Sequence, residues 1–126
     1  MEVSQEYLEQ QLMTLLLKGD HPILAILRQQ YTVAKIASRE FTGVGFFLNF
    51  DVPQDIPLVD PPNFEAGHIS IDLENLPNGA GCILFVREGK LDFLECYTYT
   101  DNWPDHIMIK SLSNAHPAIP RSRSLL

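Results

Sequence analysis

A short turn signal between two apolar segments is the feature that most constrains the fold of this chain. Residues 82–87 and 91–99 are rich in β-branched, aromatic and other apolar side chains, and Glu88, Gly89 and Lys90 separate them. Glycine readily adopts the positive φ angle that a tight hairpin turn requires. We therefore expect a β-hairpin here, with its first strand in a central position because that strand is almost continuously hydrophobic.

The N-terminal part of the chain has helical rather than alternating spacing. Between Ser4, which is a good N-cap, and Gly19, leucines recur at the spacing of one helix face. Asp20 can cap a second, short helix that has Pro22 in its first turn and a broad aliphatic stripe. Both apolar stripes need a common partner, so we expect an αα-hairpin that packs on the strands formed by the rest of the chain.

A second β-rich region follows these helices. Strand-favouring residues begin at Tyr31, and apolar and other side chains alternate over residues 44–50. Gly43 and Gly45 mark either the turn of a hairpin with residues 33–40 or a bulge within one bent strand.

Two further segments alternate and are predicted to form strands, residues 68–73 and 107–112. The proline-rich residues 51–66 are expected to form a long surface loop. Phe47 interrupts the polar side of its strand, so this strand is expected either to be covered on both faces or to contribute to an interface, and we favour burial.

The length of 126 residues is the usual size of one domain. We predict a single α+β domain over residues 1–113, in which an N-terminal αα-hairpin packs on one face of a mostly antiparallel sheet of about five strands. Prolines and serines then replace periodic structure, so residues 114–126 are expected to form a loosely ordered C-terminal tail.

The charge balance excludes some classes of partner. Sixteen acidic residues against nine basic residues give a net charge of -7, which repels a phosphate backbone and argues against nucleic-acid binding. No apolar run approaches the ~20 residues that span a bilayer, and the acidic, polar start of the chain does not resemble a secretory signal. We therefore expect a cytoplasmic protein that has no membrane partner.

Residue types that carry catalytic or metal chemistry are sparse. The four histidines are far apart in the sequence, and no pair has a metal-ligand spacing, so we expect no metal ion and no cofactor. Cys82 and Cys96 lie on the two strands of the predicted hairpin and are expected to be close together, as reduced thiols that fill the core. We predict no catalytic residue, and an enzyme is the less favoured class.

The segment of residues 94–105 concentrates side chains suited to a contact surface. It holds half of the tyrosines, the only tryptophan and three carboxylates. Aromatic side chains with polar tips are enriched at protein interfaces. Alternatively, Trp103 and Tyr97 close the end of the core while Asp101 shapes a turn. The candidate binding residues are Arg39, Glu40, Glu95, Tyr97, Tyr99, Asp101, Trp103 and Asp105.

Three phrases carry a family resemblance: REFTGVGF at residues 39–46, ILFVREG at 83–89 and LECYTYTDNWP at 94–104. They resemble a small bacterial family of uncharacterised proteins, and the resemblance covers residues 32–110 at most. Family members often have glycine where Cys96 stands here, which weakens any catalytic role for this thiol. The resemblance implies a compact bacterial cytosolic domain and brings no known activity.

Two functional hypotheses follow. The leading one is a non-enzymatic interaction or accessory module, which could be immunity-like, that presents residues 95–105 to a protein partner or to a copy of itself. A homodimer is favoured over a monomer because Phe46 and Phe47 point to opposite faces of one strand. The alternative is a small-molecule binder or small enzyme with a pocket near the 95–105 segment, bounded by the 51–66 loop.

Overall fold

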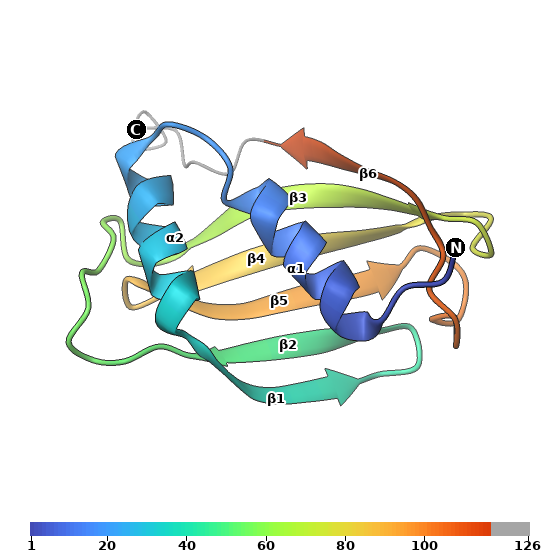
Figure 1. The fold of residues 1–126 in the computed structure, drawn as a ribbon, viewed down its shortest axis with the longest axis horizontal. Helices are drawn as coiled ribbons and strands as arrows, with labels where there is room; N and C mark the ends of the chain where they lie inside the picture. The colour runs from blue at the N-terminus through green and yellow to red at the C-terminus, as the bar shows by residue number, and fades with distance from the viewer. Residues whose placement is uncertain (117–126) are drawn as a thin grey trace.

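The computed structural model of the protein describes residues 1–116, in which two helices precede one six-stranded sheet (Figure 1). The helices are α1 (Gln5–Leu16) and α2 (Pro22–Val33). The strands are β1 (Lys35–Phe41), β2 (Gly45–Asp51), β3 (Phe64–Leu73), β4 (Ala80–Arg87), β5 (Lys90–Thr98) and β6 (Ile109–His116). They are ordered β1-β2-β5-β4-β3-β6, and every neighbouring pair is antiparallel. The α+β prediction is confirmed, but the sheet has six strands rather than about five.

Local capping explains where the helices begin. The Ser4 hydroxyl oxygen accepts a hydrogen bond from the backbone N–H of Tyr7 at 3.0 Å, which confirms the predicted cap of α1. Helix α2 is capped by His21 rather than by Asp20, because Nδ1 of His21 accepts from the backbone N–H of Ile23 at 3.1 Å. Pro22 then occupies the first helical turn, where its missing N–H has no consequence.

Helix α2 continues through residues 31–33, which we expected to begin a strand. Leu24, Leu27 and Gln30 are buried along one side of this helix, so tertiary packing extends it. Thr32 and Val33 at its end are exposed, and they continue the helix against their strand propensity because the Ala34 N–H donates to the carbonyl of Gln30.

The two alternatives for the glycine-rich segment are decided in favour of the hairpin. Strands β1 and β2 pair across a turn in which Gly43 has a φ angle of 90°. Gly45 begins β2 so close to β5 that a Cβ atom there would lie 1.9 Å from the carbonyl oxygen of Cys96. This hairpin supplies the additional strand of the sheet.

Two predicted boundaries shift because strands pair beyond their alternating cores. β3 begins at Phe64, so the proline-rich loop is shorter than the predicted 51–66. β6 pairs with β3 as far as His116, which brings the first residues of the predicted 114–126 tail into the sheet. Residues 117–126 of that tail lie outside the described part of the chain.

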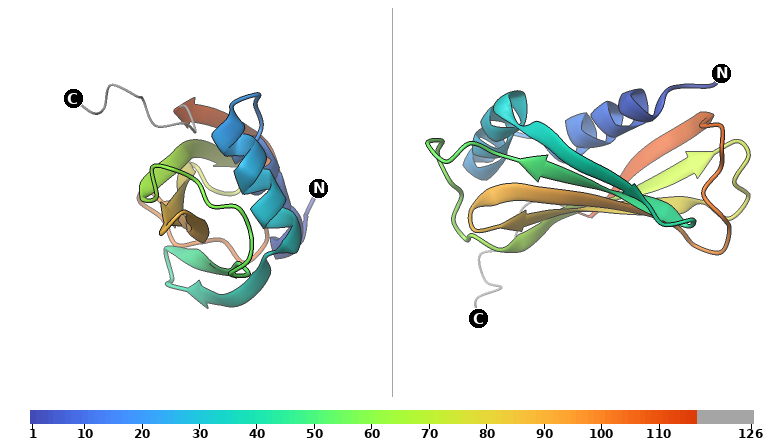
Figure 2. Two further views of the ribbon diagram at one scale, coloured as in Figure 1. Left: turned by 90° about the vertical axis from the view of Figure 1, so that its left-hand side faces the viewer. Right: turned by 90° about the horizontal axis from the view of Figure 1, so that it is seen from below.

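Both helices lie on the same side of the sheet, as the two views of Figure 2 show. The core fills the space between the two layers with aliphatic side chains from both, together with Phe46, Cys82 and Cys96. Gln30 is buried in this layer, where its amide donates to the carbonyls of Pro57 and Gly89 and accepts from the N–H of Leu91. These bonds attach α2 to the β4–β5 turn.

The opposite side of the sheet carries neither helix, and we call it the helix-free face. Residues directly opposite each other in antiparallel strands point to the same face, so the strand register identifies its members. Phe47 belongs to it and is half-buried rather than buried as expected. The central residues of the face are Glu40, Phe47, Asn49, His68, Ile83, Phe85, Phe93, Glu95 and Tyr97.

Candidate functional site

The structure distributes the eight candidate residues over four places. Four of them, Glu40, Glu95, Tyr97 and Tyr99, gather on the helix-free face, whereas Trp103 and Asp105 line a groove at one end of the sheet. Arg39 faces the helices, and Asp101 lies in the turn that follows β5. The segment of residues 94–105 therefore contributes to two separate surfaces.

A row of side chains that alternate between polar and apolar crosses five strands of the helix-free face. The register places Glu40 opposite Phe47, Phe47 opposite Glu95, and Glu95 opposite Ile83. Ile83 in turn lies opposite His68 on β3. Two carboxylates and a histidine thus alternate with two large apolar side chains across the width of the sheet.

The two carboxylates of this row differ in their partners. Glu40 accepts a hydrogen bond from the Nδ2 amide of Asn49 at 3.0 Å. Glu95 is half-buried at the centre of the face, and among residues 1–116 no side chain or backbone group donates to it or forms an ion pair with it. Glu95 is therefore a carboxylate whose charge is not compensated by any residue in the described part of the chain.

Aromatic rings lie beside this carboxylate. The ring of Phe93 stacks on that of Phe85 with a centroid distance of 4.4 Å and lies 5.8 Å from the ring of Phe47. The Arg87 guanidinium lies 5.3 Å from the Phe85 ring centroid. All three phenylalanines are only half-buried, so their outer surfaces remain available for contact.

Three polar atoms converge over Gly81 near the end of the same face. A Cβ atom at Gly81 would lie 2.8 Å from the hydroxyl oxygen of Tyr99, 2.9 Å from Nε2 of His68 and 3.1 Å from the hydroxyl oxygen of Tyr97. Glycine at this position leaves the room that the three side chains occupy. The Tyr97 hydroxyl lies 3.2 Å from His68 Nε2, and burial, followed by the neighbouring Tyr99, raises the pKa of Tyr97.

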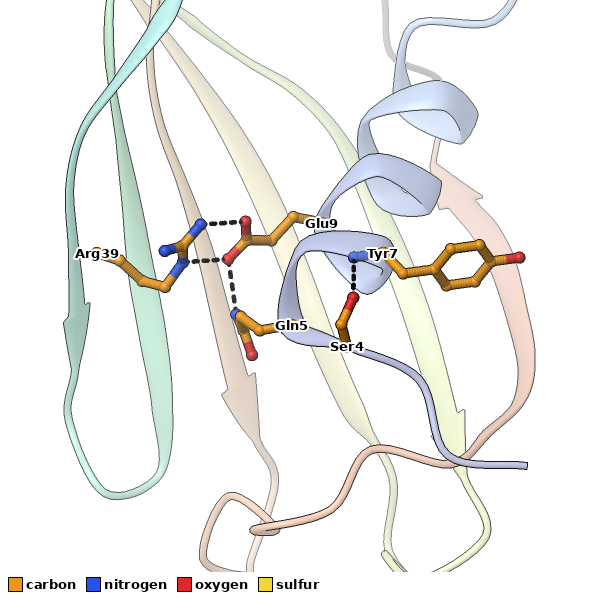
Figure 3. A network of polar contacts seen from close by, with 5 residues as sticks. All are labelled: Ser4, Gln5, Tyr7, Glu9 and Arg39. Atoms are coloured by element: carbon orange, nitrogen blue, oxygen red, sulfur yellow. Dashed lines mark hydrogen bonds and ion pairs between the residues drawn. The ribbon is translucent and has the colours of Figure 1, made fainter.

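Arg39 is occupied by an internal ion pair and does not join the helix-free face. Figure 3 shows its guanidinium between β1 and α1, where Nε and Nη2 donate to the two carboxylate oxygens of Glu9 at 2.6 and 2.7 Å. The same carboxylate accepts from Nε2 of Gln5. This fork-shaped hydrogen bonding raises the pKa of Arg39. Arg39 therefore has a structural role in the described chain.

The groove at the end of the sheet is the second surface, and we call it the end groove. It has a volume of about 520 Å³ and lies between the β1–β2 turn, the start of α1 and residues 103–107. The Trp103 ring meets the buried Phe46 ring edge to face at 5.3 Å. Asp105 and Glu2 also line the groove. Sequence reasoning missed Phe41 and Glu2, because no local signal shows that the chain start approaches this turn.

Asp101 shapes the turn after β5. Its carbonyl oxygen accepts from the Thr98 hydroxyl, and its carboxylate accepts from Nδ2 of Asn78 at 3.3 Å. This is the alternative that we considered for Asp101. The proline-rich loop lies at the opposite end of the sheet, where Val59 bonds to the β4–β5 turn, so the expected pocket bounded by that loop and the Tyr97–Trp103 segment does not form (Figure 1).

Residues 1–116 contain no cluster of three or more side chains that could hold a metal ion. Cys82 and Cys96 are directly opposite each other on the helix-covered face as free thiols, and burial raises the pKa of Cys96. His68 lies on the other face, so it forms no nucleophile and base pair with Cys96. No helix in the described part of the chain is long and apolar enough to cross a bilayer.

Comparisons of the chain with protein-family models, with curated proteins and with solved structures find no match.

Proposed function

We propose that the protein is a non-catalytic interaction module that binds a basic segment of a partner protein on its helix-free face. The observation that carries this proposal is the Glu95 carboxylate, which has no partner within residues 1–116 and lies at the centre of a half-buried aromatic surface. A lysine or arginine side chain from a partner would compensate its charge, while the surrounding rings would contact the partner's apolar groups.

The composition of the face matches what interfaces use. Tyrosine and phenylalanine provide large contact areas with little loss of conformational entropy, and a central charge provides orientation. Tyr99 is 50% exposed and continues this surface beyond the end of β5. An aromatic region around one carboxylate thus favours a partner that alternates basic and apolar residues.

Charge also favours a foreign partner over a second copy of this chain. Residues 1–116 carry sixteen acidic and seven basic side chains. Two helix-free faces packed against each other would bring carboxylates into a shared, desolvated surface, where like charges repel. The homodimer that we expected from the sequence therefore becomes the alternative arrangement.

Site-specific photocrosslinking tests the proposal. A photoreactive phenylalanine analogue replaces Tyr99, and the protein is irradiated in the cells that express it naturally. We expect a crosslinked partner whose attached peptide contains lysine or arginine beside apolar residues, identified by mass spectrometry. The charge reversal Glu95→Lys should abolish that crosslink, because it would set two positive charges against each other.

The matched control is Asp55→Lys, which reverses an exposed carboxylate in the proline-rich loop, outside the strands of the sheet. This variant should retain the crosslink. A crosslink that survives Glu95→Lys, or one that forms only between copies of this chain, would contradict the proposal. Light scattering of the purified protein adds a second check, because a stable dimer that the Tyr99→Ala and Trp103→Ala double variant dissociates would support self-association instead.

A further inference from the structure

The end groove combines a hollow, exposed aromatic surface and negative charge. Its volume of about 520 Å³ falls within the 300–1,000 Å³ range of small-ligand sites. It lies at the end of the sheet, apart from the central carboxylate of the helix-free face, so a ligand bound there would not need the partner proposed above.

The aromatic walls are held in place by the fold. Trp103 is fixed by the hydrogen bond from its backbone N–H to the carbonyl of Gly43 at 2.8 Å and by its contact with Phe46. Phe41 lies at the end of β1 and is 60% exposed, although the centroid of its ring lies 5.9 Å from that of the Phe46 ring. An aromatic ring that is fixed but exposed offers its face to a ligand.

The charged side chains among the described residues that line the groove are all acidic. Glu2 and Asp105 line the groove, and neither lysine nor arginine is among the described residues that do so. Glu2 is held near the rim because the N–H of Val3 bonds to the carbonyl of Ile107 at 2.8 Å. The imidazole Nδ1 of His106 lies 2.8 Å from the Glu2 carboxylate and is the nearby group that competes for it.

We propose that the end groove binds an organic cation, a guanidinium or ammonium group on a short apolar stem. The cation lies between the Glu2 and Asp105 carboxylates, and the stem packs against the Phe41 and Trp103 rings. Aromatic faces and carboxylates both attract cations, and an apolar stem would cover the exposed Phe41 ring. The cation belongs either to a free small molecule or to a basic side chain of a protein.

Intrinsic fluorescence tests this proposal, because Trp103 is the only tryptophan in the chain. Butylguanidinium is titrated into the purified full-length protein at low ionic strength and pH 8, while backbone amide signals are followed by NMR. We expect a saturable change in Trp103 emission with half-saturation at about 1 mM, a weak affinity suited to exposed ion pairs and one stem. The amide shifts should centre on residues 41–45 and 103–107.

Matched probes and variants separate cation recognition from general charge attraction. Butylurea has a similar shape without the charge and should not bind. Asp105→Asn should weaken butylguanidinium binding about threefold, and the Glu2→Gln and Asp105→Asn double variant about tenfold. Asp55→Asn removes a carboxylate in the loop at the other end of the sheet and should leave binding unchanged. Phe41→Ala should abolish the NMR shifts because the stem loses one wall.

Several results would overturn the inference: equal binding of butylurea, equal weakening by Asp55→Asn, or no saturable change. A capped alanine–arginine–alanine tripeptide distinguishes the two sources of the cation. If it binds at least tenfold more tightly than butylguanidinium, the groove recognises a basic side chain of a protein, and if it does not, a free small molecule is the ligand. Glu95→Lys should leave this binding unchanged, so the groove and the helix-free face are tested independently.

Discussion

The two faces of the sheet differ in whether polar side chains have hydrogen-bond partners within the described chain. On the helix-covered face, the carboxylate of Glu9 is bonded by Arg39 and Gln5, and the amide of Gln30 makes three hydrogen bonds. On the helix-free face, the Glu95 carboxylate has no partner among the described residues. Burial under the helices removes water, so polar groups there must be paired within the chain. The free-energy cost of an unpaired carboxylate stays small only where water or a partner can reach it.

Neighbouring residues of β4 should give the largest contrast between the faces. Leu84 is fully buried beneath the helices, whereas Ile83 is half-buried on the helix-free face. We expect Leu84→Ala to lower the free energy of unfolding by about 3 kcal/mol, because it leaves a cavity in the core, and Ile83→Ala to lower it by about 1 kcal/mol or less. Urea denaturation followed by circular dichroism measures both. Equal losses would show that the helix-free face is as well covered as the core.

The side-chain amides of Gln30 on the helix-covered face and Asn49 on the helix-free face provide the second contrast. Gln30→Ala would leave the Leu91 N–H without its buried acceptor, and we expect a loss of about 2 kcal/mol. Asn49→Ala removes bonds to Ser38 and Glu40 at the surface and should change the free energy of unfolding by about 0.5 kcal/mol or less. The same urea experiment measures both variants. A loss for Asn49→Ala that matches the loss for Gln30→Ala would contradict the distinction between the faces.

Variants that affect Glu9 and Glu95 should show the same contrast, with the larger loss of stability on the helix-covered face. The difference should be smaller than for the two amides, because Arg39, the partner of Glu9, is partly exposed. The side chains of Arg39 and Glu9 are 25% and 6% exposed, and Arg39→Ala would leave Glu9 without its cation. We expect a loss of about 1–2 kcal/mol, reduced from the fully buried case by solvent screening. Glu95→Gln should leave the free energy of unfolding unchanged within about 0.5 kcal/mol.

A compensating substitution checks the cause of this effect. The Arg39→Met and Glu9→Gln double variant should recover part of the stability lost in Arg39→Met alone, because the uncompensated carboxylate is gone. If the double variant is no more stable than Arg39→Met, the loss comes from packing of the arginine stem rather than from its charge.

Local signals were sufficient for α1, for the existence of α2 and for the β4–β5 hairpin, and they failed where the outcome depends on contacts distant in the sequence. The Ser4 cap and the Gly89 turn are encoded within a few residues. The half-burial of Phe47 depends on which face the helices cover, and two amphipathic helices can cover only one. Residues 31–33 had strand propensity but lie in α2, where the Ala34 N–H bonds to the Gln30 carbonyl and the Tyr31 ring packs on Phe50.

The candidate residues were predictable as a cluster in sequence but not as a site in space. Glu95 and Trp103 are eight positions apart and reach different surfaces, because β5 ends between them. The alternation of β5 could have assigned Glu95 and Tyr97 to one face and Cys96 to the other. The end groove could not have been found in this way, because it requires the Val3–Ile107 bridge between the chain start and a distant loop.

The smallest effect is expected at the exposed ion pair between Glu2 and His106. The hydrogen bond to Glu2, then the charge of Glu2, raises the pKa of His106 above the ordinary value of 6.5. A histidine whose pKa is raised by folding stabilises the fold below its unfolded value, and this contribution is lost as the pH rises through the higher, folded value. NMR titration of the imidazole C–H signals should therefore give a midpoint above 6.5 for His106, and Glu2→Gln should bring it back towards 6.5. Asp55→Asn, at the other end of the sheet, should not move it.

Because both side chains are exposed, Glu2→Gln should leave the melting temperature nearly unchanged, in contrast to Arg39→Ala. An unchanged His106 midpoint in Glu2→Gln would mean that the two groups do not pair in solution, and His106 would then not compete with a cation for Glu2 in the end groove.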